Sequence, residues 1–369
     1  ARNADSTDAS RGEDTECDGT SHSAGVSTSA SVLAQGIEEA LHSAGVSMNE
    51  ESVYCAGALH NASSGLDAAL GLKARMESET VLEHAGVHDH EYEGETTGKH
   101  NLLEAPKNQR EAYAREDAEL WREAERLEMQ TLIAKNTFAY VDDAERGNQR
   151  KLPCRWVYAL KTDGRGNIVR YKARLVARGD VQPYYTFTET SSPTAKTAVS
   201  RMLMALGTTR GDYISSFDIK AAFVSALIDS ELYIELPEGY QAPPGKVVRL
   251  RNCLYGTKQA SRLFAQALSE WLTAYGFQTV DDDETLFILV DGKDYLIVST
   301  YVDDGIAVHS SQEIYDRFLA ALGERFELSA KGDLTSYCGA TIDYDREEGV
   351  LFLAQQQYTL DLLKRFQMS

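Results

Sequence analysis

One apolar stretch, from Leu286 to Val308, constrains the fold more than any other part of the chain. Its apolar runs are interrupted by two short polar breaks, Asp291-Gly292 and Asp303-Asp304. Asp-Gly between apolar runs is typical of a tight β-hairpin turn. Asp-Asp is not, because adjacent carboxylates repel each other and Asp is depleted from strands. The stretch predicts two successive hairpins, with the acidic pair in the turn of the second.

Two carboxylates at the tip of an apolar hairpin are suited to binding a cation, and a solvated acidic turn is the alternative. A third acid, Asp218, ends a short strand predicted at 213–218. A buried strand end is a costly place for a carboxylate unless its charge is compensated. One carboxylate from this strand and two from the hairpin match a two-metal site. Two Mg²⁺ ions about 4 Å apart would serve an in-line phosphoryl displacement.

Charge is unevenly distributed along the 369 residues, whose formal net charge is −20. Residues 1–100 carry 18 Asp and Glu against 5 Lys and Arg, whereas the other 269 residues carry 39 against 32. A basic block with ten Lys and Arg and one acid lies between Arg146 and Arg178. The global charge therefore does not exclude a nucleic-acid partner for the second part of the chain.

Residues 1–104 are predicted to be a mostly disordered, acidic, low-complexity extension, because they contain few large apolar residues. They hold seven of the eight histidines, at no convincing metal-ligand spacing, and two copies of HSAGVS that low complexity explains. The five cysteines are scattered, which favours a reducing intracellular setting over a disulfide framework. No apolar run reaches membrane length, so no membrane association is expected. The initial Ala suggests a fragment or processed product.

Residues 105–369 read as one folded α+β region. Helices are expected at 111–134, 193–207, 256–276, 313–326 and 357–366, and a helix start after Asp218. Strands are expected at 155–160, 168–177, 213–218, 232–236 and 247–250, with a β-rich segment at 337–353. Alternation in the second strand puts Arg170, Lys172 and Arg174 on one face. Such a face suits a triphosphate or a nucleic-acid backbone, and a solvated hairpin face is the alternative.

The motifs resemble, in chain order, those of copia-type LTR-retrotransposon reverse transcriptases. The matching blocks are the helix at 121–128, RWVYALK at 155–161, RYKARLVARG at 170–179, FDIKAAF at 217–223, LYIELPEGY at 232–240, LYGTKQASR at 254–262, YVDDGIAV at 301–308 and the C-terminal block at 353–368. The resemblance covers about residues 105–369. It implies a fingers-palm polymerase fold whose palm is an antiparallel sheet flanked by helices. It also implies an RNA-directed DNA polymerase that uses template-primer, dNTPs and two Mg²⁺, with Mn²⁺ as a substitute.

The resemblance also implies roles for individual residues. Asp218, Asp303 and Asp304 match the catalytic carboxylates, and the Ile219 carbonyl would be a further metal ligand. Phe223 matches the position that excludes a 2′-hydroxyl, although a plain core Phe is the alternative. The remaining matches are to nucleotide-binding positions: Lys172, Arg174, Tyr255, Gly256, Lys258 and Gln259.

Several positions depart from the family pattern. Thr257 and Ser261 stand where the family usually has Leu and Pro, and Ser225-Ala226 follow the AFV segment. The chain ends at Ser369, before the thumb and RNase H that the resemblance would place next. A non-catalytic, truncated remnant is therefore a rival hypothesis, and a template-independent nucleotidyltransferase is a weaker one. Nothing in the sequence indicates the oligomeric state.

Overall fold

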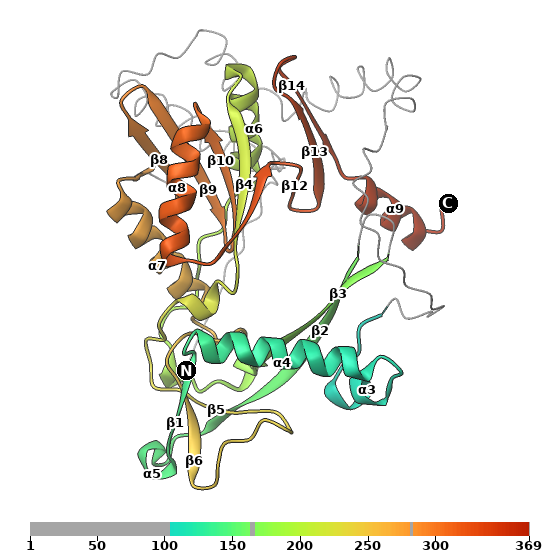
Figure 1. The fold of residues 1–369 in the computed structure, drawn as a ribbon, viewed down its shortest axis with the longest axis vertical. Coiled ribbons are helices and arrows are strands. Elements are labelled where there is room, and N and C mark those ends of the chain that lie inside the picture. The colour runs from blue at the N-terminus through green and yellow to red at the C-terminus, as the bar shows by residue number, and fades with distance from the viewer. Residues whose placement is uncertain (1–103, 163–166, 281–282, 369) are drawn as a thin grey trace, which may run out of the picture.

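The computed structural model describes residues 104–162, 167–280 and 283–368, which form the α+β region expected from the sequence (Figure 1). The predicted disordered extension, residues 1–104, lies outside the described residues except for Glu104. No helix within the described ranges is long and apolar enough to cross a bilayer.

The first part of the region is built on a five-stranded sheet with the order β1-β6-β5-β2-β3. The pairs are antiparallel except β2 with β5. The strands are β1 (Phe138–Asp142), β2 (Lys151–Thr162), β3 (Ile168–Ala177), β5 (Tyr233–Glu235) and β6 (Lys246–Leu250). The helices are α3 (Gln109–Ala114), α4 (Ala118–Ala134) and the short α5 (Asp143–Arg146).

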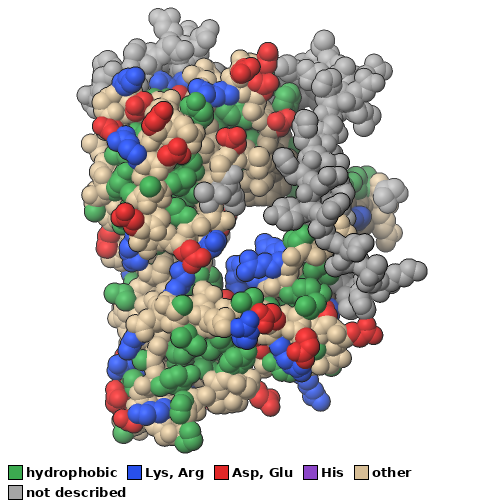
Figure 2. Space-filling model, viewed as in Figure 1, with side chains coloured by type: hydrophobic (Ala, Val, Ile, Leu, Met, Phe, Trp, Pro, Cys, Tyr) green, Lys and Arg blue, Asp and Glu red, His purple; other side chains and the backbone are tan. Residues whose placement is uncertain are grey.

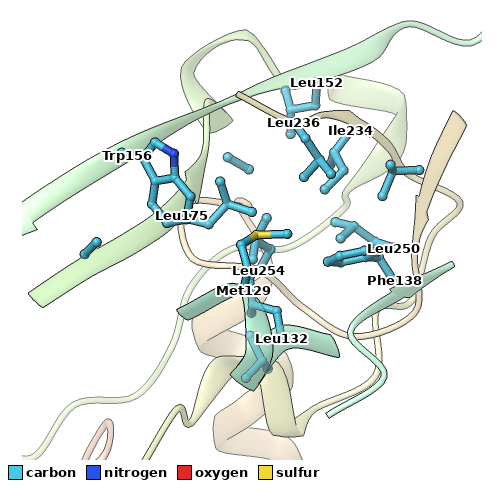
Figure 3. Close-up of a cluster of buried hydrophobic side chains, with 14 of the residues drawn as sticks. Met129, Leu132, Phe138, Leu152, Trp156, Leu175, Ile234, Leu236, Leu250 and Leu254 are labelled. Carbon is cyan, nitrogen blue, oxygen red and sulfur yellow. The ribbon is translucent and has the colours of Figure 1, made fainter. Parts of the chain in front are cut away.

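Helix α4 packs its apolar stripe against this sheet and closes a core that includes Met129, Leu132, Trp156 and Leu175 (Figure 3). Trp121 of α4 is fully buried and makes edge-on contacts with Tyr158 and Tyr171. The helix expected at 111–134 is in fact two helices. The chain is extended at Arg115, and an ion pair of 3.0 Å between Arg115 and Asp117 fixes the break.

The second part of the region is built on an antiparallel six-stranded sheet with the order β11-β4-β10-β9-β8-β7, called the central sheet below. Its strands are β4 (Tyr213–Ile219), β7 (Gln278–Val280), β8 (Asp283–Asp291), β9 (Asp294–Tyr301), β10 (Asp304–His309) and β11 (Leu328–Asp333). The hairpins β8–β9 and β9–β10 confirm the two turns predicted between Leu286 and Val308.

Helices cover both faces of the central sheet. Helices α7 (Ala260–Tyr275) and α8 (Gln312–Arg325) pack on one face around Phe217, Leu296 and Val298. Helix α6 (Thr197–Arg210) packs on the other face around Ile214 and Ile306. The chain ends with a small sheet and a helix, which are β12 (Ser336–Tyr337), β13 (Ala340–Asp345), β14 (Val350–Ala354) and α9 (Gln356–Arg365).

Three expected helix starts are wrong. Helix α6 begins at Thr197 rather than at Pro193, and α7 begins at Ala260 rather than at Gly256. The segment after Asp218 forms only the 3₁₀ turn η3 (Phe223–Ser225), because Ala221 adopts a positive φ of 50° that a helix does not allow. The missing helical turn before Ala260 leaves Tyr255, Gly256 and Lys258 in a loop.

Gly305, the residue after Asp304, has no side chain, and this leaves room for the Phe217 ring of the paired strand β4 to pack over β10. A Cβ atom at Gly305 would come within 2.2 Å of the Phe217 ring, far inside van der Waals contact. Phe217 is 1% exposed and packs edge-on against Phe318 of α8, so its ring cannot move aside.

We predict that Gly305→Ala lowers the free energy of unfolding by roughly 1–3 kcal/mol, because the added methyl overpacks this contact. Urea unfolding measures the change. Gly323→Ala is the matched control: Gly323 is exposed in α8, its added Cβ meets only ordinary contacts, and Ala favours a helix by about 0.5–1 kcal/mol. Equal stability of the two variants would contradict the packing argument.

Candidate active site

The register of β4 and β10 places Asp218 directly opposite Asp304. Directly paired residues of antiparallel strands point to the same face, with Cβ atoms about 5 Å apart. Since Ile214 and Ile306 lie at even spacing from the two acids, this is the face that α6 covers farther along the strands. Two carboxylates separated by 85 residues in sequence are thus neighbours on one surface.

Asp303 lies in the turn that joins β9 to β10. Tyr301 pairs with Asp304, so the turn consists of Val302 and Asp303, and Asp304 is already in the strand rather than in the turn as expected. Val302 adopts a φ of +56°, a strained conformation for a β-branched residue. The Ile219 amide donates a 2.8 Å hydrogen bond to the Asp303 carbonyl, which fastens this strained turn to the end of β4. Ile219 itself is 1% exposed.

Mg²⁺ is the metal ion that the sequence predicts at these acidic residues. Within the described ranges, no three His, Cys, Asp or Glu side chains are grouped so that they could hold a metal ion. Mg²⁺, however, is commonly held by one or two carboxylates together with water and substrate phosphates. Asp218 and Asp304, which are paired across the two strands, are compatible with that mode, and Asp303 lies one residue away on the turn.

A cavity of about 280 Å³ adjoins the acidic face. It is lined by Ser216, Asp304 and Gly305 and by the turn between β12 and β13, including Tyr337 and Cys338. Burial, with the Asp304 charge as a smaller cause, raises the pKa of Tyr337 to about 12. The small sheet β12-β13-β14 thus forms one wall of the site.

The three predicted cations of β3 follow one uninterrupted ladder with β2, so Arg170, Lys172 and Arg174 share a face as expected. The pKa of Lys172 is lowered, first by burial and then by the neighbouring cations Arg174, Arg170 and Lys161. Figure 2 shows Lys and Arg side chains gathered at the edge of a hollow between the two parts of the region. A surface that concentrates positive charge in this way favours a polyanion.

Glu128 of α4 is a carboxylate whose charge interacts with these three cations. This role was not predicted from the sequence. Its carboxylate accepts a hydrogen bond of 3.4 Å from the Leu175 amide of β3. Burial raises its pKa, while Arg174, Lys172 and Arg170 oppose that shift. A helical Glu seven residues after a core Trp is one sequence signal that could have revealed it.

Tyr255 connects the cations to the acids. The Arg174 guanidinium lies 5.2 Å from the centre of the Tyr255 ring, and Phe223 packs edge-on against that ring at 5.3 Å. Burial raises the pKa of Tyr255 to about 12, with the charge of Asp303 as a smaller contribution. The structure therefore brings Arg174, Tyr255, Phe223 and the acidic turn together. Phe223 is half-buried and also packs against the hydrophobic cluster under α7.

Gly256 is required by the close approach of two backbones. Its φ is +87°, and a Cβ atom would come within 2.1 Å of the Ala177 carbonyl oxygen. The Ala177 amide donates a 2.7 Å hydrogen bond to the Tyr255 carbonyl, so the loop is tied to the end of β3. Lys258 is exposed beyond this contact.

Gln259 does not reach the surface on which a nucleotide would lie. It is 0% exposed, its Oε1 accepts a 2.9 Å hydrogen bond from Gln182, and its Nε2 donates to the Thr186 carbonyl, Asp229 and Ser230. The resemblance implied a nucleotide contact for Gln259, which lies immediately before the first residue of α7. Gln259 therefore links two loops by hydrogen bonds, the one at residues 182–186 and the one at residues 229–230.

Comparison with known proteins shows which family the chain resembles. Residues 135–369 match the family model described as reverse transcriptase (RNA-dependent DNA polymerase). The chain is 33% identical over 251 residues, 67% of its length, to the retrovirus-related Pol polyprotein from transposon RE2 of Arabidopsis thaliana. It is 30% identical over 245 residues, 65% of its length, to that from transposon TNT 1-94 of Nicotiana tabacum.

The chain belongs to the reverse transcriptase family. Its relatives among plant Pol polyproteins identify it as the copia-type retrotransposon form of that family. The aligned part covers only 17–18% of the length of these polyproteins.

We predict that Glu128→Gln strengthens polyanion binding. The Glu128 charge acts on Arg174, Lys172 and Arg170, so its loss leaves the β3 cations without this compensating negative charge. The same loss raises the affinity for inorganic tripolyphosphate several-fold, measured by calorimetry. Glu123→Gln on the exposed side of α4 is the control and should leave that affinity unchanged. Weaker tripolyphosphate binding by the Glu128 variant would contradict the assigned role.

Proposed function

We propose that this chain is the catalytic core of an RNA-directed DNA polymerase. In this proposal the central sheet is the palm, and the five-stranded sheet with the β2–β3 hairpin forms the fingers. The single observation that carries the proposal is the direct pairing of Asp218 with Asp304 beside the strained Asp303 turn. The reaction is nucleotidyl transfer from a dNTP to the 3′-hydroxyl of a primer paired with a template.

Asp218 and Asp304 would hold Mg²⁺, with Asp303 and the Ile219 carbonyl as the further candidate ligands. When bound, the metal supplies activation of the attacking hydroxyl and stabilisation of the leaving pyrophosphate. The chain contributes a fixed geometry: the β4–β10 register sets the two carboxylates, and the Ile219–Asp303 hydrogen bond holds the turn. Carboxylates fixed before substrate arrives need no reorganisation during the reaction.

Lys172 and Arg174 would receive the triphosphate, with Lys258 as a further cation. Arg174 is oriented by the ring of Tyr255, so its guanidinium is held in place before the nucleotide binds. Burial lowers the pKa of Lys172 first and the neighbouring cations lower it further, and a bound triphosphate would offset this second cause. Binding of the anion is thereby coupled to the stability of the hairpin.

Phe223 and Tyr255 would form the wall against the sugar and base of the incoming nucleotide, with Gly256 allowing the close backbone approach. Phe223 is held edge-on between Tyr255 and Phe264, so its ring has a defined position. A rigid ring at the sugar excludes an added 2′-hydroxyl by volume.

We predict that Phe223→Ala raises incorporation of ribonucleotides relative to deoxyribonucleotides by about 10–100-fold, because the space for the 2′-hydroxyl opens. Single-nucleotide primer extension with each substrate measures the ratio. Phe223→Tyr, which keeps the ring, should keep the discrimination. An unchanged ratio in the Ala variant would show that Phe223 is a core residue only.

Primer extension tests the proposed function itself. The purified chain should extend a primed RNA template in the presence of Mg²⁺. Asp218→Asn or Asp304→Asn should reduce the rate by about 100-fold or more, because each removes one of the paired carboxylates. Asp316→Asn, an exposed carboxylate on α8, is the matched control and should extend normally. A correctly folded chain without extension would favour a non-catalytic remnant, and extension without template would indicate a template-independent transferase.

A further inference from the structure

Two adjacent tyrosines project from the loop that follows β3. Tyr184 is 84% exposed, the largest value among the large hydrophobic side chains described, and Tyr185 is 63% exposed. Their rings contact each other edge-on at 6.0 Å. Aromatic rings exposed to this extent bury little of their apolar surface, so packing does not explain their place in the structure.

The loop that carries them is nonetheless firmly anchored on both sides. Gln182 and Thr186, which flank the tyrosines, are 7% and 6% exposed. Gln182 accepts a 2.9 Å hydrogen bond from the Lys258 amide and donates to Gln259, and Gln259 donates in turn to the Thr186 carbonyl. Four hydrogen-bonded residues thus hold the 3₁₀ turn η2 (Tyr184–Thr186) in a fixed position.

The anchor points belong to the candidate active site. Lys258 and Gln259 follow directly on Tyr255 and Gly256, which contact Arg174 and the end of β3. Gly179, at the start of the tyrosine loop, lies so close to Gly256 that a Cβ atom would come within 2.0 Å of the Gly256 carbonyl oxygen. The loop with Tyr184 and Tyr185 is therefore held rigidly against the loop with Tyr255 and Gly256.

The charges around the loop favour an anion. Arg178 pairs with Asp180 at 2.7 Å, and the charge of Arg155 also acts on Asp180. Lys258 is exposed on the other side of the anchor. A second acid near the anchor, Asp229, is paired with Arg262. A phosphate backbone can therefore approach, and aromatic faces beside such a backbone stack on bases without regard to sequence.

We propose that Tyr184 and Tyr185 form a stacking platform for unpaired bases of the nucleic-acid template next to the active site. This inference rests on the proposed function, since it takes the nucleic acid of the polymerase as its ligand. It also assigns a role to Gln182 and Gln259, which are positioning residues that fix Tyr184 and Tyr185 relative to Tyr255.

Binding measurements without chemistry test the platform. Fluorescence anisotropy in Ca²⁺ compares two primer-templates of equal paired length, one blunt and one with an unpaired 5′ template extension. The double variant Tyr184→Ala/Tyr185→Ala should bind the extended template about tenfold or more weakly, and the blunt duplex as the native chain does. The double variant Tyr184→Phe/Tyr185→Phe should bind both as the native chain does, because the rings remain. Tyr358→Ala on α9, where the tyrosine is 59% exposed, is the control.

The salt dependence separates stacking from charge. Loss of stacking lowers affinity without changing the slope of log affinity against log salt, whereas loss of a phosphate contact makes it shallower. Equal affinities of the native and double Ala chains for the extended template would overturn the proposal, as would an equal loss on both duplexes. So would a change of oligomeric state with nucleic-acid binding unchanged, which would assign the tyrosines to a protein contact. Since no nucleotide is added, an inactive polymerase would not mimic any of these outcomes.

Discussion

The structure depends on the register between β4 and β10. These strands are neighbours in the central sheet, and their pairing sets Asp218 opposite Asp304 on one face and Gly305 beside Phe217. A shift by one residue would turn every side chain of a strand to the other face. It would bury the carboxylates under α7 and α8 and expose Phe217. The hydrophobic clusters on the two faces therefore stabilise the geometry of the acids by fixing the register.

The rest of the candidate site is attached to this centre through Tyr255. Its ring packs against Phe223 and under Arg174, and its backbone is hydrogen-bonded to the end of β3. Helix α4 also contacts β3: Trp121 packs against the Tyr171 ring, and Glu128 accepts a hydrogen bond from the Leu175 amide. Buried Glu125 fastens α4 further, since it accepts hydrogen bonds from Tyr158 and Tyr113. The cationic surface is thus positioned by packing, and its charge is balanced by one helical carboxylate.

The acidic residues could be predicted from the sequence because their signal is local: carboxylates that interrupt apolar runs. The alternation of Arg170, Lys172 and Arg174 is also local, and the structure confirms the shared face. The position of Asp304 within the strand could not be foreseen, because it follows from the positive φ of Val302. The roles of Glu128 and Gln259 depend on contacts between distant segments. Gln259 interacts with residues at 182, 186, 229 and 230, so its buried environment is a property of the assembled fold.

The central claim is that Asp218 and Asp304 form one metal-binding pair. Anomalous diffraction from crystals of the chain with primer-template, a non-hydrolysable dNTP analogue and Mn²⁺ tests it most directly. The account predicts a manganese peak within coordination distance of both carboxylates, about 2.0–2.6 Å from their oxygens, and no such peak in Asp304→Asn crystals. Manganese bound elsewhere, with the two carboxylates turned apart, would contradict the account.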